Sequence, residues 1–315
     1  MNIKSRTTPS EIHVLEGLIR RLPPTHRLRR RLEEDLAYRR KGYVGEKAVD
    51  RFTASLLQGN FTILHDVYLK HKGSGFQIDT LIVGPHCIFV IEIKNYLGTV
   101  TFDFNLNQFT REHNGKITGF RNPIIQATTN KLLLTEWLTD RNVNDIPIYP
   151  LVAISDPGTI IKVIPEDQIL SREVMHGEYM PQQVWKMDQE FNGKRHGHLH
   201  QKIGAIILGA CEKYDFDYEK EYGINQRELL GGVHCSSCGR LGMVRTYKYW
   251  QCNYCQLSSR NAHIPGINDY LLLVKPWISN KACMQFLQIP SRHLTTRLLK
   301  TSNLIYDPVR REWNK

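Results

Sequence analysis

"GFQIDTLIVGPHCIFVIEIKNYLG", residues 75–98, predicts two apolar β-strands joined by a tight turn at "GPH". Three charged residues, Asp79, Glu92 and Lys94, interrupt this otherwise buried pattern. Because strand side chains alternate between the two faces of a sheet, Glu92 and Lys94 share one face. The turn also places Asp79 across the hairpin from Ile91 and Glu92. We therefore expect two carboxylates to converge, with a lysine one step further along the strand.

Two converging carboxylates require a partner, because an unpaired buried charge costs on the order of several kcal/mol. Oxygen ligands of this kind favour Mg²⁺ or Mn²⁺ over zinc. A metal ion held by two carboxylates beside a lysine can polarise a phosphodiester and activate water. The alternative is an ordinary glutamate–lysine pair at the solvent edge of a strand, and the pattern leaves both interpretations open.

The surrounding sequence predicts a mixed α/β domain with a central sheet flanked by helices. "GEKAVDRFTASLLQG", residues 45–59, has the spacing of a helix whose inner stripe holds Val49, Phe52 and Leu56. A second helix is expected from Asn122, with Pro123 in its first turn. "NGK" at 114–116 is a strong hairpin signal. Further strands are expected at 61–69, 99–104, 108–113, 146–155 and 159–164.

Three separated segments resemble one known family. They are "GYVGEKAVD" at 42–50, the hairpin with its continuation "TV" at 76–100, and "NPIIQATTNKLLL" at 122–134. Together they look like the nuclease-related domain family, NERD, which is grouped with the PD-(D/E)XK nucleases. The resemblance covers roughly residues 40–155 and implies a restriction-endonuclease-like fold and a metal-dependent nuclease.

The resemblance also implies roles for individual residues. Asp79 matches the metal-binding aspartate, and Glu92 and Lys94 match the E-x-K of the next strand. Glu46 matches the acidic residue of the first motif, although an acid favoured by the helix dipole would look the same. Gln126 matches a polar helix position, although it could be a surface amide. The proline of the literal "PD" motif is absent, since Ile78 precedes Asp79.

Four cysteines predict a second metal site. Cys235-x₂-Cys238 and Cys252-x₂-Cys255 are separated by thirteen residues, a spacer slightly shorter than usual, and two such knuckles indicate a closed, structural four-thiolate zinc site. A redox or disulfide pair is the alternative. The segment between the knuckles resembles a zinc ribbon, and its charged and aromatic residues are candidates for nucleic-acid contact. These candidates are Arg240, Arg245, Tyr247, Lys248 and Trp250.

The segment "NKACMQFLQIPSRHLTTRLLKTSNLIYD", residues 280–307, predicts two short helices with a turn at "QIPSR". It resembles a helix-turn-helix whose second helix would present Arg292 and Arg297 to nucleic acid. A plain helical hairpin on a basic protein would give the same pattern, and the sequence does not separate the two.

Composition favours a polyanionic partner. The chain has 315 residues, a formal net charge of +11 and a hydrophobic fraction of 41%, which is enough for real cores. Nucleic acid, with DNA ahead of RNA, is the expected partner. No signal peptide or membrane span is expected, and clustered cysteines suit a reducing cytoplasm.

Five segments are expected. They are a basic helical segment at 1–41, a nuclease-like domain at 42–180, a helical connector at 181–230, a zinc ribbon at 231–260 and a possible helix-turn-helix unit at 261–315. The favoured function is a Mg²⁺- or Mn²⁺-dependent nuclease. A non-catalytic DNA-binding protein is the main alternative, and a membrane-surface partner acting through the Arg-rich N-terminal helix is a weaker one. Oligomeric state stays open.

Overall fold

The structure, a computed structural model, describes residues 1–165, 170–191 and 199–315. Within the expected nuclease-like domain 166–169 lie outside the described residues, as do 192–198 within the expected connector. The chain forms two compact units. The sheet unit contains Met1–Thr8 and Arg40–Tyr214, and the ribbon unit contains Pro9–Arg39 and Asp215–Lys315. Helix α2 (Arg29–Thr53) contributes residues to both.

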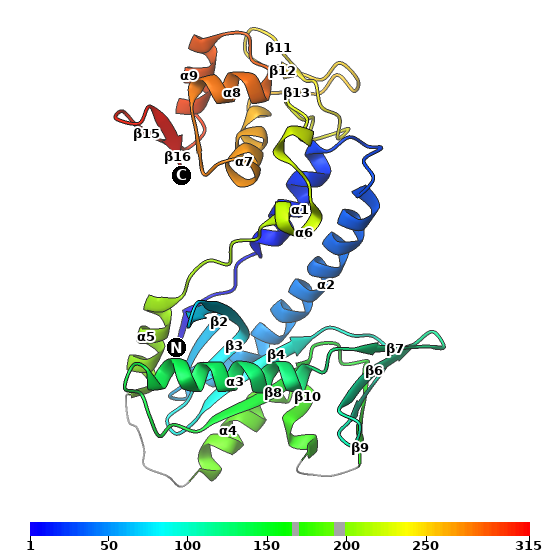
Figure 1. The fold of residues 1–315 in the computed structure, drawn as a ribbon, viewed down its shortest axis with the longest axis vertical. Coiled ribbons are helices and arrows are strands. Elements are labelled where there is room, and N and C mark those ends of the chain that lie inside the picture. Colours follow the sequence, from blue (N-terminus) through cyan, green and yellow to red (C-terminus); the bar gives the residue numbers. More distant parts are fainter. Residues whose placement is uncertain (166–169, 192–198) are drawn as a thin grey trace. The chain divides into compact units, whose positions relative to one another are not determined.

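A six-stranded mixed sheet lies at the centre of the sheet unit (Figure 1). Its order is β1 (Asn2–Lys4), β2 (Thr62–His71), β3 (Ser74–Val83), β4 (Ile88–Lys94), β8 (Ile148–Ile154) and β10 (Val174–His176). The pairs β2–β3 and β3–β4 are antiparallel, whereas β1–β2, β4–β8 and β8–β10 are parallel. The predicted hairpin is confirmed, with Thr80 paired to Ile91 and Val83 to Ile88.

Helices cover both faces of this sheet. On one face α3 (Pro123–Thr139) and α5 (Leu199–Ala210) pack through Leu134, Trp137 and Ile203 against strand residues that include Val90. Figure 1 shows α3 running across the strands. On the other face lie Val49 of α2 and residues of α4 (Met180–Glu190). The predicted mixed α/β architecture is therefore confirmed.

One residue of the expected inner stripe is misplaced. Val49 is fully buried and Leu56, in the short 3-10 segment η1 (Ala54–Gln58), is buried as well. Phe52 is 37% exposed, so the expectation for it was wrong. The regular helix ends at Thr53, and the change to 3-10 geometry alters the spacing on which the stripe was based.

A smaller four-stranded sheet packs beside the first, in the order β7-β6-β5-β9. Its strands are β5 (Thr99–Asp103), β6 (Gln108–His113), β7 (Lys116–Phe120) and β9 (Ile160–Ile164). The β6–β7 turn uses Asn114 at φ 52° and Gly115 at φ 73°. Two consecutive left-handed residues are what a two-residue hairpin requires, so the predicted turn is confirmed.

The ribbon unit contains small elements around its own core. Its helices are α1 (Ser10–Arg21), α6 (Tyr218–Tyr222), α7 (His263–Leu273), α8 (Asn280–Leu287) and α9 (Arg292–Lys300). Its strands are β11 (Val244–Arg245), β12 (Trp250–Gln251), β13 (Ser258–Ser259), β14 (Trp277–Ile278), β15 (Ile305–Asp307) and β16 (Glu312–Asn314). Short 3-10 turns are η2 (Leu170–Glu173) in the sheet unit and η3 (Gln226–Glu228) here. The buried pair Arg21–Asp269, 2.8 Å apart, joins α1 to α7.

The N-terminal segment differs from the expected helix at its start. Residues 2–4 form β1, a parallel edge strand beside β2. The backbone N–H of Ile63 donates to the Met1 carbonyl, and the Lys4 ammonium donates to the carbonyls of His65 and Asp66. Helix begins only at Ser10. In the part of the chain that the structure describes, no helix combines the length and apolar character needed to cross a membrane.

Candidate metal centres and nucleic-acid surface

The β3–β4 hairpin brings together the residues singled out from the sequence. The Asp79 carboxylate accepts the backbone N–H of Ile93 at 2.8 Å, which fixes it against the neighbouring strand. Glu92 is 2% exposed, and its Oε1 lies 2.6 Å from the Lys94 ammonium. Lys94 also donates to the Gln126 amide oxygen of α3 at 3.4 Å. Four of the five predicted catalytic residues therefore lie together on the central strands β3 and β4 and on helix α3.

In the part of the chain that the structure describes, the second carboxylate oxygen of Glu92 lacks the hydrogen bond that buried polar atoms normally make. Its Oε2 is buried and has no hydrogen-bond partner among the described residues. A buried oxygen without a donor costs free energy that a bound cation would recover.

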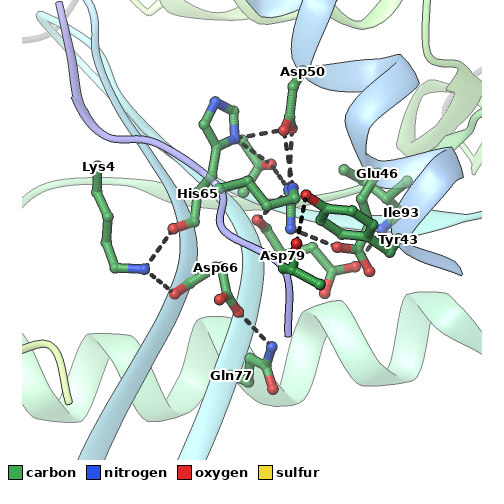
Figure 2. A network of polar contacts seen from close by, with 12 residues as sticks. Lys4, Tyr43, Glu46, Asp50, His65, Asp66, Gln77, Asp79 and Ile93 are labelled. Atoms are coloured by element: carbon green, nitrogen blue, oxygen red, sulfur yellow. Dashed lines mark hydrogen bonds and ion pairs between the residues drawn. The ribbon is translucent and has the colours of Figure 1, made fainter. Parts of the chain in front are cut away.

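The fifth predicted residue, Glu46, reaches this region from α2. Its carboxylate accepts from the Arg6 guanidinium at 2.7 Å. The same guanidinium donates to the Asp79 backbone carbonyl at 2.7 Å and to both oxygens of Asp50 at 2.9 and 3.1 Å. Figure 2 shows Glu46, Asp50, Asp79 and His65 in this one network. We call Glu46, Asp50, Asp79 and Glu92 the acidic cluster.

Arg6 is the functional candidate that sequence reasoning missed. Its side chain is 2% exposed although it comes from a segment expected to be a solvated basic helix. β1 places it, because a parallel edge strand carries the chain directly to the start of the acidic cluster. A lone Arg in a basic N-terminal stretch gives no sequence signal for this position, and Asp50 was likewise not singled out.

Electrostatics in the acidic cluster are unbalanced. Burial first and the charge of Asp79 second raise the pKa of Glu92 to about 8 and that of Glu46 to about 7. Burial also raises the pKa of Asp79. When ionised, the four carboxylates face the cations Arg6 and Lys94, and Asp50 also contacts the His65 imidazole, while Asp66 adds a further negative charge near Glu46 and Asp79. A divalent cation would offset this excess of negative charge.

The acidic cluster therefore fits a hard divalent ion by its oxygen donors, its gathered carboxylates and the Glu92 oxygen that has no hydrogen-bond donor in the described part of the chain. Among the described residues, only the cysteine set brings three or more potential ligand atoms close enough to hold an ion. The carboxylates of the acidic cluster would therefore have to approach one another around a bound ion. Arg6 and Lys94 contact Glu46 and Glu92 respectively, so each glutamate keeps one oxygen for another partner.

The four cysteines form a preorganised thiolate site. The sulfurs of Cys235, Cys238, Cys252 and Cys255 all lie within 4.8 Å of one another, and two of the S–S separations are 3.6 Å. Tetrahedral zinc with Zn–S bonds of about 2.3 Å requires sulfurs about 3.8 Å apart, so the geometry fits. The backbone N–H of Cys255 lowers the pKa of Cys252 to about 6, which favours the thiolate. The cluster supports zinc binding and leaves no open ligand position.

The surface of the ribbon presents cations over tyrosine rings. The Arg240 guanidinium lies 4.5 Å from the Tyr254 ring centre, and the Lys248 ammonium lies 5.5 Å from Tyr247, which is 89% exposed. Trp250 differs from the sequence-based expectation, because it is 2% exposed and its Nε1 donates to His263 at 3.3 Å. Its indole is a core residue and offers no face for stacking.

Arg245 stands apart from the exposed cations. Its guanidinium lies over Trp250, 5.4 Å from the ring centre, and two of its nitrogens are buried without a partner among the described residues.

The two predicted C-terminal helices are present as α8 and α9, joined through Gln288 in a left-handed conformation. Ser279 and Ser291 cap them by accepting the backbone N–H groups of Ala282 and Leu294. Arg292 and Arg297 are both exposed. They lie five positions apart on α9, so they leave the helix in different directions.

Comparison with known proteins bears on the sheet unit. Residues 41–155 match the family model of the nuclease-related domain, NERD. Over 182 residues the chain is 25% identical to an uncharacterized protein of Bacillus anthracis, and the match covers 52% of this chain and 85% of that protein. No solved structure matches the chain. The family resemblance seen in the sequence is confirmed for residues 41–155.

Proposed function

Because residues 41–155 match the nuclease-related domain, we propose that this protein is a Mg²⁺- or Mn²⁺-dependent nuclease acting on DNA. The observation that carries the proposal is the arrangement of Asp79, Glu92 and Lys94 on adjacent strands. One oxygen of Glu92 is buried without a donor in the described residues, and several carboxylates gather around the hairpin. An ordinary surface glutamate–lysine pair has neither property.

Asp79 and Glu92 would hold the ion, and Glu46 would complete its oxygen shell. The bound ion would supply Lewis-acid polarisation of the phosphodiester and lower the pKa of a coordinated water. By holding the ion, these carboxylates would set where the phosphodiester binds relative to β3 and β4. The Ile93 backbone N–H donates to one oxygen of Asp79, and this hydrogen bond fixes the orientation of the carboxylate.

Lys94 would act by charge and not as a base. Burial by itself lowers the pKa of Lys94, but the charges of Glu92 and Asp79 outweigh it and raise the pKa above the ordinary lysine value. The ammonium therefore keeps its proton at neutral pH. Held between Glu92 and Gln126, it can stabilise negative charge that develops on the phosphate oxygens.

DNA is proposed as substrate because the rest of the chain is basic and carries exposed stacking groups. The formal net charge is +11. The Arg240–Tyr254 and Lys248–Tyr247 pairs of the ribbon combine a cation with an aromatic face, which suits binding to phosphate and base.

The test is cleavage of plasmid, linear duplex, single-stranded DNA and RNA by the full chain in Mg²⁺, Mn²⁺ or EDTA. Asp79→Asn, Glu92→Gln and Lys94→Met preserve side-chain size and should each reduce cleavage by about 10²-fold or more. Glu112→Gln is the matched control, because Glu112 is an exposed carboxylate on β6 of the same unit. We expect it to cleave like the wild type.

Equal cleavage by wild type and all three site variants would exclude the acidic cluster as the active site. Absence of cleavage on every substrate, together with retained DNA binding, would support a non-catalytic DNA-binding protein. That protein would use the basic surface and the ribbon, and the acidic cluster would have a structural role.

A further inference from the structure

A cavity of about 920 Å³ lies in the ribbon unit, away from both candidate metal centres in sequence. Its walls come from α8, α9 and the small β14–β16–β15 sheet. This volume falls in the range of sites that hold a small molecule or one or two nucleotides. Neither the nuclease proposal nor the family match assigns it a role, since the match ends at residue 155.

The cavity is lined by cations and by no acidic residue. Arg292 and Lys300 come from α9, Lys281 from the first turn of α8, and Arg311 from the β15–β16 hairpin. All four are exposed, and none makes an ion pair within the part of the chain that the structure describes. Four cations around one cavity without an acidic residue in its described lining give it a positive potential, which attracts an anion.

The orientation of α9 distinguishes this cavity from a helix-turn-helix surface. Arg292, Thr296 and Lys300 are spaced four residues apart, so they form one face of the helix, and that face lines the cavity. Arg297 is not among the lining residues. A recognition helix would instead present this face to a DNA groove.

An aromatic pair forms the remaining wall. Tyr306 is 43% exposed, and its ring lies 4.8 Å from that of buried Trp313. Trp313 is fixed by a 2.9 Å hydrogen bond from its Nε1 to the Asn280 side-chain oxygen. Asn280 in turn donates to the Thr296 hydroxyl. Tyr306 packs against this fixed ring, so its exposed face can stack with a base at low entropic cost.

Backbone geometry adds an independent observation. Arg311 has φ 57°, a left-handed conformation that β-hairpin loops usually give to glycine or asparagine. Its neighbour Arg310 has no such conformation and turns toward Asp307, 4.0 Å away. This left-handed residue of the hairpin turn is one of the residues that line the cavity.

We propose that this cavity binds an unpaired nucleotide, with its phosphate held by cations of the lining and its base against Tyr306. The ligand could be a free nucleotide or a nucleotide within a single strand, since both present the same groups. The cavity is too small to enclose a duplex. The proposal does not depend on cleavage by the acidic cluster.

Fluorescence anisotropy of a fluorescein-labelled oligothymidylate on the full chain, in an Asp79→Asn background, tests it. Tyr306→Ala and Arg311→Gly should each weaken binding by roughly tenfold, because each removes one stacking or phosphate contact. Arg311→Gly also relieves the left-handed backbone, so its thermal stability should be equal or higher. Arg310→Ala is the matched control from the same hairpin and should bind like the parent.

Competition by ATP and by thymidine 5′-monophosphate identifies the source of the ligand. A free-nucleotide site is indicated if either compound displaces the oligonucleotide and if Arg311→Gly weakens binding of that compound as it weakens binding of the oligonucleotide. Displacement by unlabelled oligonucleotide alone indicates a single strand. Unchanged oligonucleotide binding in Tyr306→Ala and Arg311→Gly would overturn the proposal. A further variant, Arg297→Ala, changes an α9 arginine outside the cavity lining. Loss of oligonucleotide binding in that variant alone would overturn the proposal too. Equal displacement by polyglutamate, insensitive to Tyr306→Ala, would show a general anion site and would overturn it too.

Discussion

The Arg6 guanidinium contacts three acidic residues of the sheet unit. One guanidinium neutralises Asp50 through two hydrogen bonds, holds one oxygen of Glu46 and caps the Asp79 carbonyl. Burial opposes ionisation of Asp50, but the hydrogen bonds from His65 and Arg6 lower its pKa below the ordinary value. Arg6 thus keeps Asp50 charged and occupied, and it leaves the other oxygen of Glu46 available.

Replacing Arg6 tests this at the scale of one residue. Arg6→Ala would leave buried carboxylates without their cation, and we expect the unfolding free energy to fall by about 3–5 kcal/mol. Arg6→Lys keeps the charge but loses the two-pronged contact with Asp50, so its loss should be smaller. Urea denaturation measures both.

The control for Arg6 is Lys70→Ala, which removes an ion pair with Glu212 in which both side chains are about half exposed. Pairs of that kind contribute little, so its urea midpoint should barely move. If Arg6→Ala were as stable as Lys70→Ala, the buried network would not be held by Arg6.

Sequence could bring Asp79, Glu92 and Lys94 together because a short hairpin fixes its own register. The turn at "GPH" sets Thr80 opposite Ile91, and the carboxylates follow. Arg6 could not be found in this way. It contacts Asp79 across 73 positions through an edge strand of three residues, too short to show a periodic pattern. The stacking face expected for Trp250 was wrong, because the residue is buried. An aromatic residue in a ribbon can pack in the core or contact a ligand, and the sequence pattern is the same in both cases.

At the scale of elements, a hydrogen bond to a histidine joins the zinc ribbon to helix α7. His263, the first residue of α7, is 1% exposed and accepts the Trp250 indole N–H. Burial lowers the pKa of His263 to about 4, and the nearby charge of Arg245 acts in the same direction. The contact between ribbon and helix therefore depends on a neutral imidazole.

This contact predicts acid sensitivity of the ribbon unit. Between pH 6.5 and 4 the unfolded chain binds a proton at His263 and the folded chain does not, so stability falls as pH falls. The full effect is at most about 3–4 kcal/mol, from a pKa difference of about 2.5 units. His263→Gln keeps an acceptor for Trp250 but cannot titrate, so it should show a smaller loss of melting temperature between pH 7 and 5.

Release of zinc at low pH contributes to the same loss, so the comparison with wild type is what isolates His263. His13→Gln, at a site whose side chain is 54% exposed, serves as the control and should melt like wild type at each pH. Identical pH profiles for His263→Gln and wild type would contradict the role given to the imidazole.

The sequence predicts elements that are marked by their own turn or cap residues. It does not predict elements that form only by pairing with residues far away in the sequence. The hairpin at Asn114-Gly115 and the capped start of α3 at Asn122 follow from turn and cap chemistry alone. The five expected segments remain a prediction, and the division of the N-terminal residues between two units has no local signal. Residues 1–8 belong to the sheet unit because β1 pairs with β2, a contact about sixty positions away.

At the scale of the whole molecule, charge is the property that most constrains the partner. A net charge of +11 disfavours self-association and attracts polyanions over a distance set by salt. Exposed lysines and arginines in both the ribbon surface and the cavity of the ribbon unit would contact phosphates. Binding should then be driven largely by release of counterions.

Salt dependence of DNA binding measures this directly. For the full chain carrying Asp79→Asn, a footprint of six or more phosphates predicts a loss of affinity of about 10³-fold between 50 and 200 mM salt. Removing the two exposed ribbon cations in Arg240→Ala/Lys248→Ala should reduce the slope of log affinity against log salt by about two. Lys70→Ala/Lys72→Ala, which removes two exposed cations that are already paired to Glu212 and Glu136, is the matched control and should leave the slope nearly unchanged. A shallow slope in the parent protein would mean that base stacking and apolar contact outweigh phosphate contact, and the net charge would then serve solubility more than recognition.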